Sequence, residues 1–240
     1  MNWDYHQGGK RREKMNKGLF ITGTGTDVGK TYVTALIVKK FKEAGLNVAY
    51  FKAAMSGNEK DENGKLIPGD ALHIKEVSKI KQPLESMCPY VYEKAISPHL
   101  ASQLEGNPVC LDVIKEEYDK LCDEYDFVVC EGSGGIICPI RYDDKTIMLE
   151  DIIKLLDLPC LIIADAGLGT INNTVLTYEY MKNINILTKG IILNNFHKGD
   201  LMEEDNKKMC EIKTGIAVIS TVSTNEKEID IDINKLIMED

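Results

Sequence analysis

Short apolar runs alternate along the chain with stretches in which apolar residues recur every three or four positions. Continuous apolar runs are typical of strands that helices cover on both faces, and the longer period is typical of amphipathic helices. Strands are expected at Leu19–Ile21, Asn47–Phe51, Tyr90–Tyr92, Asp126–Gly132, Pro159–Asp165, Lys189–Asn195 and Gly215–Ile219. Helices are expected at Val33–Phe41, Asp70–Ile80, Leu100–Leu104, Leu111–Asp123, Asn172–Lys182 and Asp200–Lys213. The alternation predicts an α/β fold with one doubly wound, mostly parallel sheet flanked by helices.

A chain of 240 residues is long enough for one sizeable α/β domain or two small ones. No linker, internal repeat or low-complexity tract divides it, so we expect one domain over residues 18–240. Residues 1–17 are expected to be a disordered N-terminal extension. No apolar run approaches the roughly 20 residues of a membrane helix, and the N-terminus lacks the apolar region of a secretory signal. A cytoplasmic location is the resulting expectation.

The formal net charge is −9, and because residues 1–17 carry five basic and two acidic groups, the remainder is more acidic still. The acidic net charge of residues 18–240 argues against nucleic acid or an anionic membrane as the main partner. Arg141 is the one arginine beyond residue 17, so an anionic ligand would be held by lysine, backbone and metal. The seven cysteines include no Cys-x-x-Cys and do not indicate a disulfide framework or a zinc site.

The strongest single signal is the stretch LFITGTGTDVGKTY at residues 19–32, which reads as strand, tight turn and helix. Glycines let backbone N–H groups of the turn point inward at an anion, and the helix N-terminus adds its positive end. Lys30 can reach the β- and γ-phosphates of a nucleoside triphosphate, and Thr31 can offer its hydroxyl to Mg²⁺. Thr24 stands where the usual pattern has glycine, so the alternative is a glycine-rich turn with a chance Gly-Lys-Thr.

Polar residues gather at the carboxyl ends of the expected strands, where sheets of this kind bind ligands. They include Lys52, Glu131, Asp165 and Asn194. Glu131 is placed to hold a metal, or else to cap the loop that follows it. Lys52 is either functional or a solvated strand-end lysine, and Asn194 either reads a purine edge or is a turn residue. Asp70 has two interpretations as well, a functional carboxylate or a helix N-cap.

Two glycine-bearing turns offer further backbone sites. Gly132–Gly135 predicts a concavity that a substrate can approach closely. The turn at residues 167–170 opens a helix, and it is either an anion site for a carboxylate or an ordinary strand–helix connection.

An ordered set of motifs runs from residue 18 to about residue 195. It comprises Thr22–Thr31, Phe51-Lys52 with Ser56-Gly57, Gly69-Asp70-Ala71, Ser97-Pro98-His99, Glu131–Gly135, Leu168-Gly169 with Ile171-Asn172, and Asn194. In order and spacing this set resembles the dethiobiotin synthetase family. The resemblance implies a P-loop NTPase fold and an ATP-dependent ligase of biotin biosynthesis that uses Mg²⁺. It also implies a homodimer, because in this family the end of the helix that follows Gly169 belongs to a dimer interface near the active site.

The implied substrates are 7,8-diaminononanoate, CO₂ (or bicarbonate) and ATP. CO₂ adds to one amine to give a carbamate, and a carbamate oxygen attacks the γ-phosphate to give a carbamic–phosphoric anhydride. The second amine then attacks the carbonyl carbon, expels phosphate and closes the cyclic urea of dethiobiotin. Lysines and Mg²⁺ offset the repulsion between the two anionic reactants, and positioning supplies most of the rest.

By similarity, the residues fall into four groups. The catalytic group is Thr26, Lys30 and Lys52. Nucleotide-binding residues are Thr26, Asp27, Val28, Gly29, Lys30, Thr31, Tyr32, Glu131 and Asn194. Metal ligands are Thr31, Asp70 and Glu131. Substrate-binding residues are Lys52, Ser56, Gly134, Gly135, Gly169, Thr170, Ile171 and Asn172.

Three positions depart from the family pattern. Ala53 stands where proline is usual, Asn173 where some members have histidine, and Ser220 where a proline often frames the base. The last departure bears on selectivity for ATP over other triphosphates.

Two competing hypotheses share the phosphate loop. A nucleotide switch of the partition-ATPase type would carry a second lysine near the start of the loop, and residues 23–30 contain none before Lys30. A cobyrinate-type amidoligase would need a glutaminase domain, for which 240 residues leave no room.

Overall fold

The fold was obtained as a computed structural model, and the structure describes residues 18–238. The expected extension at residues 1–17 lies outside the described residues, and the treatment of residues 18–240 as one domain stays a prediction. Among the described residues, no helix is long and apolar enough to cross a membrane.

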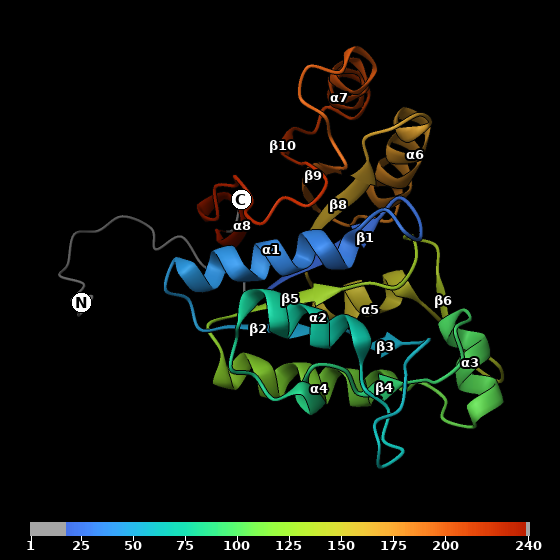
Figure 1. The fold of residues 1–240 in the computed structure, drawn as a ribbon. Coiled ribbons are helices and arrows are strands. Elements are labelled where there is room, and N and C mark those ends of the chain that lie inside the picture. Colours follow the sequence, from blue (N-terminus) through green and yellow to red (C-terminus); the bar gives the residue numbers. More distant parts are fainter. Residues whose placement is uncertain (1–17, 239–240) are drawn as a thin grey trace, which may run out of the picture.

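Six strands form a wholly parallel sheet in the order β10-β9-β8-β1-β5-β2 (Figure 1). In chain order they are β1 (Gly18–Gly23), β2 (Val48–Phe51), β5 (Phe127–Glu131), β8 (Cys160–Asp165), β9 (Thr188–Asn194) and β10 (Val218–Val222). The chain fills the sheet on one side of β1 with β2 and β5, then crosses to the other side at β8. The switch point therefore lies at β1, and ligands bind beyond such points in sheets of this type.

Helices cover both faces of the sheet (Figure 1). One face packs against α1 (Lys30–Glu43), α2 (Gly69–Ser78) and α8 (Asn234–Ile237), and the other against α4 (Leu111–Glu124), α5 (Leu149–Leu156), α6 (Thr170–Asn183) and α7 (Leu201–Thr214). Successive strand side chains point to opposite faces. In β1, Leu19 and Ile21 accordingly join the core beneath α1, whereas Phe20 joins the core on the other face. Burial on both faces explains why the strands are continuous apolar runs.

Two small strand pairs, a short helix and a 3-10 turn lie outside the main sheet. Strand β3 (Ala54–Met55) pairs in parallel with β4 (Tyr90–Val91), and β6 (Pro139–Tyr142) pairs antiparallel with β7 (Thr146–Met148). Helix α3 (Pro98–Glu105) packs against β6, and a 3-10 turn, η1 (Leu84–Ser86), precedes β4.

The predicted fold class is confirmed, and each expected strand and helix overlaps an observed one. The last strand was expected three residues too early, because Gly215 ends α7 in the left-handed conformation (φ 73°) and the strand starts at Val218. The elements that sequence patterns did not predict are β3, β6, β7, α5, α8 and the 3-10 turn η1. All are short, with at most eight residues, and a short segment shows little of its period.

Candidate active site

The loop between β1 and α1 has the geometry of an anion site. Helix α1 begins at Lys30, and Gly29 before it is left-handed, with φ 86°. A Cβ at Gly29 would lie 2.1 Å from Asn194 Nδ2, so both the backbone angle and the space restrict this position to glycine. The unpaired N–H groups of the first helical turn, with the positive end of the helix, favour a phosphate at this point.

Lys30 lies against this loop with only 7% of its surface exposed. Its Nζ donates a hydrogen bond to Gly25 O at 2.7 Å. Burial lowers the pKa of Lys30, and the neighbouring Lys52 acts in the same direction, while Glu131 opposes the shift. A buried ammonium that is only partly compensated favours an anionic ligand.

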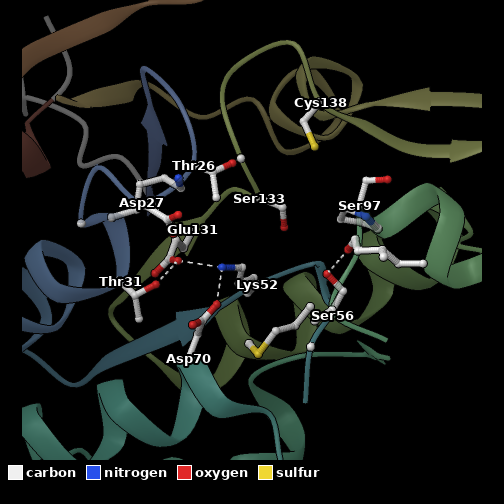
Figure 2. Close-up of a pocket in the computed structure, with 18 of the residues that line it drawn as sticks. Thr26, Asp27, Thr31, Lys52, Ser56, Asp70, Ser97, Glu131, Ser133 and Cys138 are labelled. Carbon is white, nitrogen blue, oxygen red and sulfur yellow. Dashed lines mark hydrogen bonds and ion pairs between the residues drawn. The ribbon is translucent and has the colours of Figure 1, made fainter. Parts of the chain in front are cut away.

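The side chains of Thr31, Lys52, Asp70 and Glu131 converge beside the loop (Figure 2). Lys52 Nζ lies 2.6 Å from Asp70 Oδ2 and 2.8 Å from Glu131 Oε1. Thr31 Oγ1 donates to the same Glu131 oxygen at 2.8 Å, and Tyr50 Oη donates to the other at 3.3 Å. The parallel pairing of β2 and β5 next to β1 brings Lys52 and Glu131 to one edge of the sheet.

These contacts argue against the structural interpretation of three residues, whose functional roles stay predictions. Lys52 is 6% exposed, so it is not a solvated lysine, and Glu131 is 2% exposed with both oxygens bonded to side chains. Asp70 is not an N-cap, because Pro68 takes that position and the Asp70 carboxylate pairs with Lys52.

The buried charge of Lys52 is compensated by direct contact with two carboxylates. Burial lowers the pKa of Lys52, but Glu131 and Asp70 raise it by more, so the net shift is upward and the side chain stays an ammonium. Burial, with the Glu131 charge, raises the pKa of Tyr50 well above its usual value, so its hydroxyl remains a donor.

The same group fits Mg²⁺. Its donors are a hydroxyl and two carboxylates, and hard oxygen ligands are those that Mg²⁺ prefers. Among residues 18–238 no cluster of three or more His, Cys, Asp and Glu side chains could hold a metal by itself. An ion here would need phosphate oxygens or water to complete its shell, as is usual for Mg²⁺ in nucleotide enzymes.

A cavity of about 950 Å³ opens over these groups (Figure 2). The residues in its wall that the sequence also singled out are Thr26, Asp27, Gly29, Lys30, Thr31, Tyr32, Lys52, Ser56, Asp70, Glu131 and Gly134. A volume of this order holds a ligand of drug size or larger. The structure thus brings together predicted phosphate, metal and substrate residues in one cavity.

Sequence reasoning missed part of the wall. Gly57, Ser97, Pro98 and Ser133 stood in the motifs but were given no site role of their own, and the residues in no motif are Met55, Ala95, Ile96 and Cys138. The available signal was Ser97-Pro98, which marks the start of α3, but nothing local places this turn opposite the phosphate loop. Burial raises the pKa of the Cys138 thiol, and Lys30 and Lys52 offset this only in part, so no thiolate faces the cavity.

Several predicted residues do not line this cavity in the single chain. They are Val28, Gly135, Gly169, Thr170, Ile171, Asn172 and Asn194. Gly135 packs beneath the loop, where a Cβ would lie 3.5 Å from Gly23 O. Gly169 precedes the N-terminus of α6, and Asn172 in the first turn of this helix is exposed.

Asn194 holds the phosphate loop by a side-chain hydrogen bond to its backbone. Its Nδ2 donates to Val28 O at 3.2 Å, while its buried Oδ1 has no hydrogen-bond partner among the described residues. Close by along the loop, the Tyr32 hydroxyl donates to Glu226 O and ties the start of α1 to the segment after β10. The purine contact expected of Asn194 stays a prediction.

Comparison with known proteins bears on the whole chain. A family model described as an AAA domain matches residues 17–230. An ATP-dependent dethiobiotin synthetase of Clostridium perfringens is 47% identical over 222 residues, which cover 92% of this chain and 97% of the relative. The protein of the same name from Brachyspira hyodysenteriae is 51% identical over 209 residues, covering 87% and 92%.

Solved structures support the fold alone. In the MinC:MinD cell division protein complex of Aquifex aeolicus, one chain matches with a TM-score of 0.56 at 13% identity, over 88% of this chain and 83% of that one. The sequence relatives are much nearer, and they match over nearly their whole length. With a nucleotide-type loop, a buried lysine–carboxylate cluster and these relatives, the chain is an enzyme that belongs to the family of ATP-dependent dethiobiotin synthetases.

Proposed function

We propose that the protein carboxylates 7,8-diaminononanoate with CO₂ and closes the ring to dethiobiotin, with ATP converted to ADP and phosphate. One observation carries the proposal: Lys30, Lys52 and the Thr31–Asp70–Glu131 oxygens share a cavity with the largely uncharged segments around Ser56 and residues 95–98. A triphosphate site and an uncharged wall for an aliphatic chain are what this pair of substrates needs.

The first step forms a carbamate. One amine nitrogen attacks CO₂ and loses a proton, and the product carries a negative charge. Lys52 remains an ammonium and faces the cavity, so it is placed to hold this anion together with Ser56. Lys30 and the first turn of α1 hold the triphosphate, with Thr26, Asp27 and Gly29 along the loop.

The second step transfers the γ-phosphoryl group. A carbamate oxygen attacks the γ-phosphorus, the bond to the ADP oxygen breaks, and a carbamic–phosphoric anhydride forms. The two lysines neutralise charge on the reactants and on the transferring group. Mg²⁺ held by Thr31, Asp70 and Glu131 would add charge neutralisation at the phosphates.

The third step closes the ring. The second amine attacks the carbonyl carbon of the anhydride, phosphate leaves with its bonding electron pair, and the amine loses a proton. Positioning dominates this step, because both amines belong to one bound molecule. We assign the tail carboxylate to the N-terminus of α6 at Gly169, Thr170, Ile171 and Asn172. Since these residues do not line the cavity of their own chain, the assignment requires a homodimer in which the helix reaches the partner's cavity.

The decisive assay measures phosphate release with ATP, 7,8-diaminononanoate and bicarbonate, omitting each in turn. We expect release only when all three are present, together with dethiobiotin detected by mass spectrometry. A nucleotide switch is the second candidate, favoured only by the fold likeness to the MinC:MinD complex. Hydrolysis that ignores the diamine would support the switch and contradict the synthetase.

A further inference from the structure

The side-chain amide of Asn58 lies buried between two parts of the cavity wall, with 4% of its surface exposed. Its Nδ2 donates to Met55 O at 3.0 Å and to Tyr92 O at 2.8 Å. Its Oδ1 accepts from the Gly69 N–H at 3.0 Å. Asn58 does not line the cavity itself, so any effect on the reaction must act through the residues that it holds.

On one side, Asn58 holds the turn that carries Ser56. Gly57 in this turn is left-handed, with φ 78°, and a Cβ there would lie 3.2 Å from Ala95 Cβ. Glycine therefore lets the turn pack against the segment that leads into α3. Ser56 Oγ then donates to Ile96 O at 2.6 Å, which joins the turn to the segment that leads into α3.

On the other side, Asn58 holds the start of α2. The N-terminal N–H groups of a helix need partners, and the N-cap residue of α2, Pro68, has no side chain that can accept a hydrogen bond. Asn58 Oδ1 accepts the hydrogen bond from the N–H of Gly69, the first residue of the helix, in place of an N-cap side chain. Asp70 follows directly, with its carboxylate 2.6 Å from Lys52 Nζ. A shift in the first turn would therefore move Asp70.

We propose that Asn58 is a positioning residue that fixes the Ser56 turn relative to the Asp70 carboxylate. Through them it sets where the diamine carbamate lies relative to Mg²⁺ and the triphosphate. The inference rests on the proposed function, which gives Ser56 and Asp70 their ligands. A carbamate oxygen must approach the γ-phosphorus closely, and a misplacement of about 1 Å can cost two orders of magnitude in rate.

Two variants separate the effect of the Nδ2 hydrogen bonds of Asn58 from the effect of its Oδ1 hydrogen bond. Asn58→Ala removes the three side-chain hydrogen bonds and keeps the backbone bond from Asn58 N–H to Tyr92 O at 3.1 Å. We expect about a tenfold rise both in the diamine KM and in the Mg²⁺ concentration for half-maximal rate. Asn58→Asp keeps an acceptor for Gly69 but turns an oxygen toward the carbonyl oxygens of Met55 and Tyr92. In this variant the diamine KM rises, whereas the Mg²⁺ requirement stays near that of the unaltered enzyme. If either variant does not fold, Asn58→Ser is measured in the same way and judged by the same constants.

The matched control is Thr214→Val at the end of α7. Thr214 is also buried, and its Oγ1 donates to Cys210 O at 2.7 Å and accepts from Ile216 N–H at 3.1 Å. It does not line the cavity, so we expect a lower Tm with unchanged constants. The inference is overturned if the Asn58 variants behave like this control and lose only Tm.

A second measurement needs neither substrate nor turnover. Amide hydrogen exchange at Gly69, followed by NMR, should be faster in Asn58→Ala and remain slow in Asn58→Asp. Unchanged exchange in the alanine variant contradicts the inference, whereas a lack of diamine-dependent turnover in the unaltered enzyme contradicts the proposed function instead.

Discussion

The two walls of the cavity differ in charge and in origin. One wall carries Lys30, Lys52, Asp70 and Glu131; Lys52 and Glu131 lie at the ends of main-sheet strands, and Lys30 and Asp70 lie at the starts of helices. The other consists of Met55, Ser56, Gly57 and residues 95–98, with no charged side chain, and it is built on the two-residue strands β3 and β4.

The two walls differ in the elements that support them. Parallel strands of the central sheet hold charges at fixed separations, and the large core beneath them supplies the rigidity that buried ion pairs require. The uncharged wall lies on smaller elements, held by single hydrogen bonds such as that from Ser56 to Ile96. Under the proposed function, the first wall serves ATP and the second shapes the space for the diamine.

The largest expected effect comes from the two lysines of the charged wall. Lys30→Ala and Lys52→Ala should each lower turnover by about a thousandfold or more, because each removes preorganised positive charge at the phosphates. Their stabilities should differ. Among residues 18–238, Lys30 bonds only to a carbonyl, whereas Lys52→Ala leaves buried Glu131 without its ion pair, at a cost of about 3 kcal/mol in the free energy of unfolding.

Urea unfolding measures the free energy of unfolding, and single-turnover kinetics measure the rate of the reaction. Lys115→Ala serves as the control, since that lysine pairs with Asp119 on the exposed surface of α4 and should change neither. Adding Glu131→Gln to Lys52→Ala should restore part of the stability but none of the turnover. Equal free energies of unfolding for Lys30→Ala and Lys52→Ala would show that the ion pairs of Lys52 do not stabilise the charged wall.

A smaller effect is expected where the two walls meet. Ser133 Oγ donates to Ala54 O at 2.9 Å and so joins the loop after β5 to β3. Ser133→Ala should cost about 1 kcal/mol in the free energy of unfolding. It should also raise the diamine KM more than the ATP KM, because the displaced strand carries the uncharged wall. Steady-state kinetics with each substrate varied decide this, and a larger change for ATP would contradict the division between walls.

The smallest effect lies outside both walls, at His197. Its Nδ1 lies 3.0 Å from Glu203 Oε1, and this hydrogen bond raises the pKa of His197 above the ordinary value of about 6.5. The protonated form therefore stabilises the fold. This contribution is fully present below about pH 6.5 and is lost as the pH rises through the higher folded-state pKa.

An NMR titration of His197 should show the raised pKa, and Glu203→Gln should return it toward 6.5. Activity over the same pH range should not follow this titration, because His197 does not line the cavity. If the pH dependence of turnover shifts with Glu203→Gln, His197 takes part in the reaction, and the two walls do not account for all of the site.

Sequence patterns predicted the charged wall far better than the uncharged one. Lys30, Thr31, Lys52 and Glu131 stand at strand ends or at the start of a helix, and such ends are visible in a sequence because apolar runs stop there. In the segment at 95–98, Ser97-Pro98 marks the start of α3 but not its place opposite the phosphate loop. Its place depends on the pairing of β3 with β4 and on hydrogen bonds across 34 and 40 residues.

The chain by itself determined the alternation of elements, the parallel sheet and the phosphate loop, because each follows from local period, glycine placement and apolar runs. Tertiary structure alone showed that Lys52 and Glu131 are buried and that Lys52, Asp70 and Glu131 contact one another. The residues that form this ion-paired group come from β5, from α2 and from the end of β2, up to 79 residues apart. Strand order brings them together, and no local pattern records strand order.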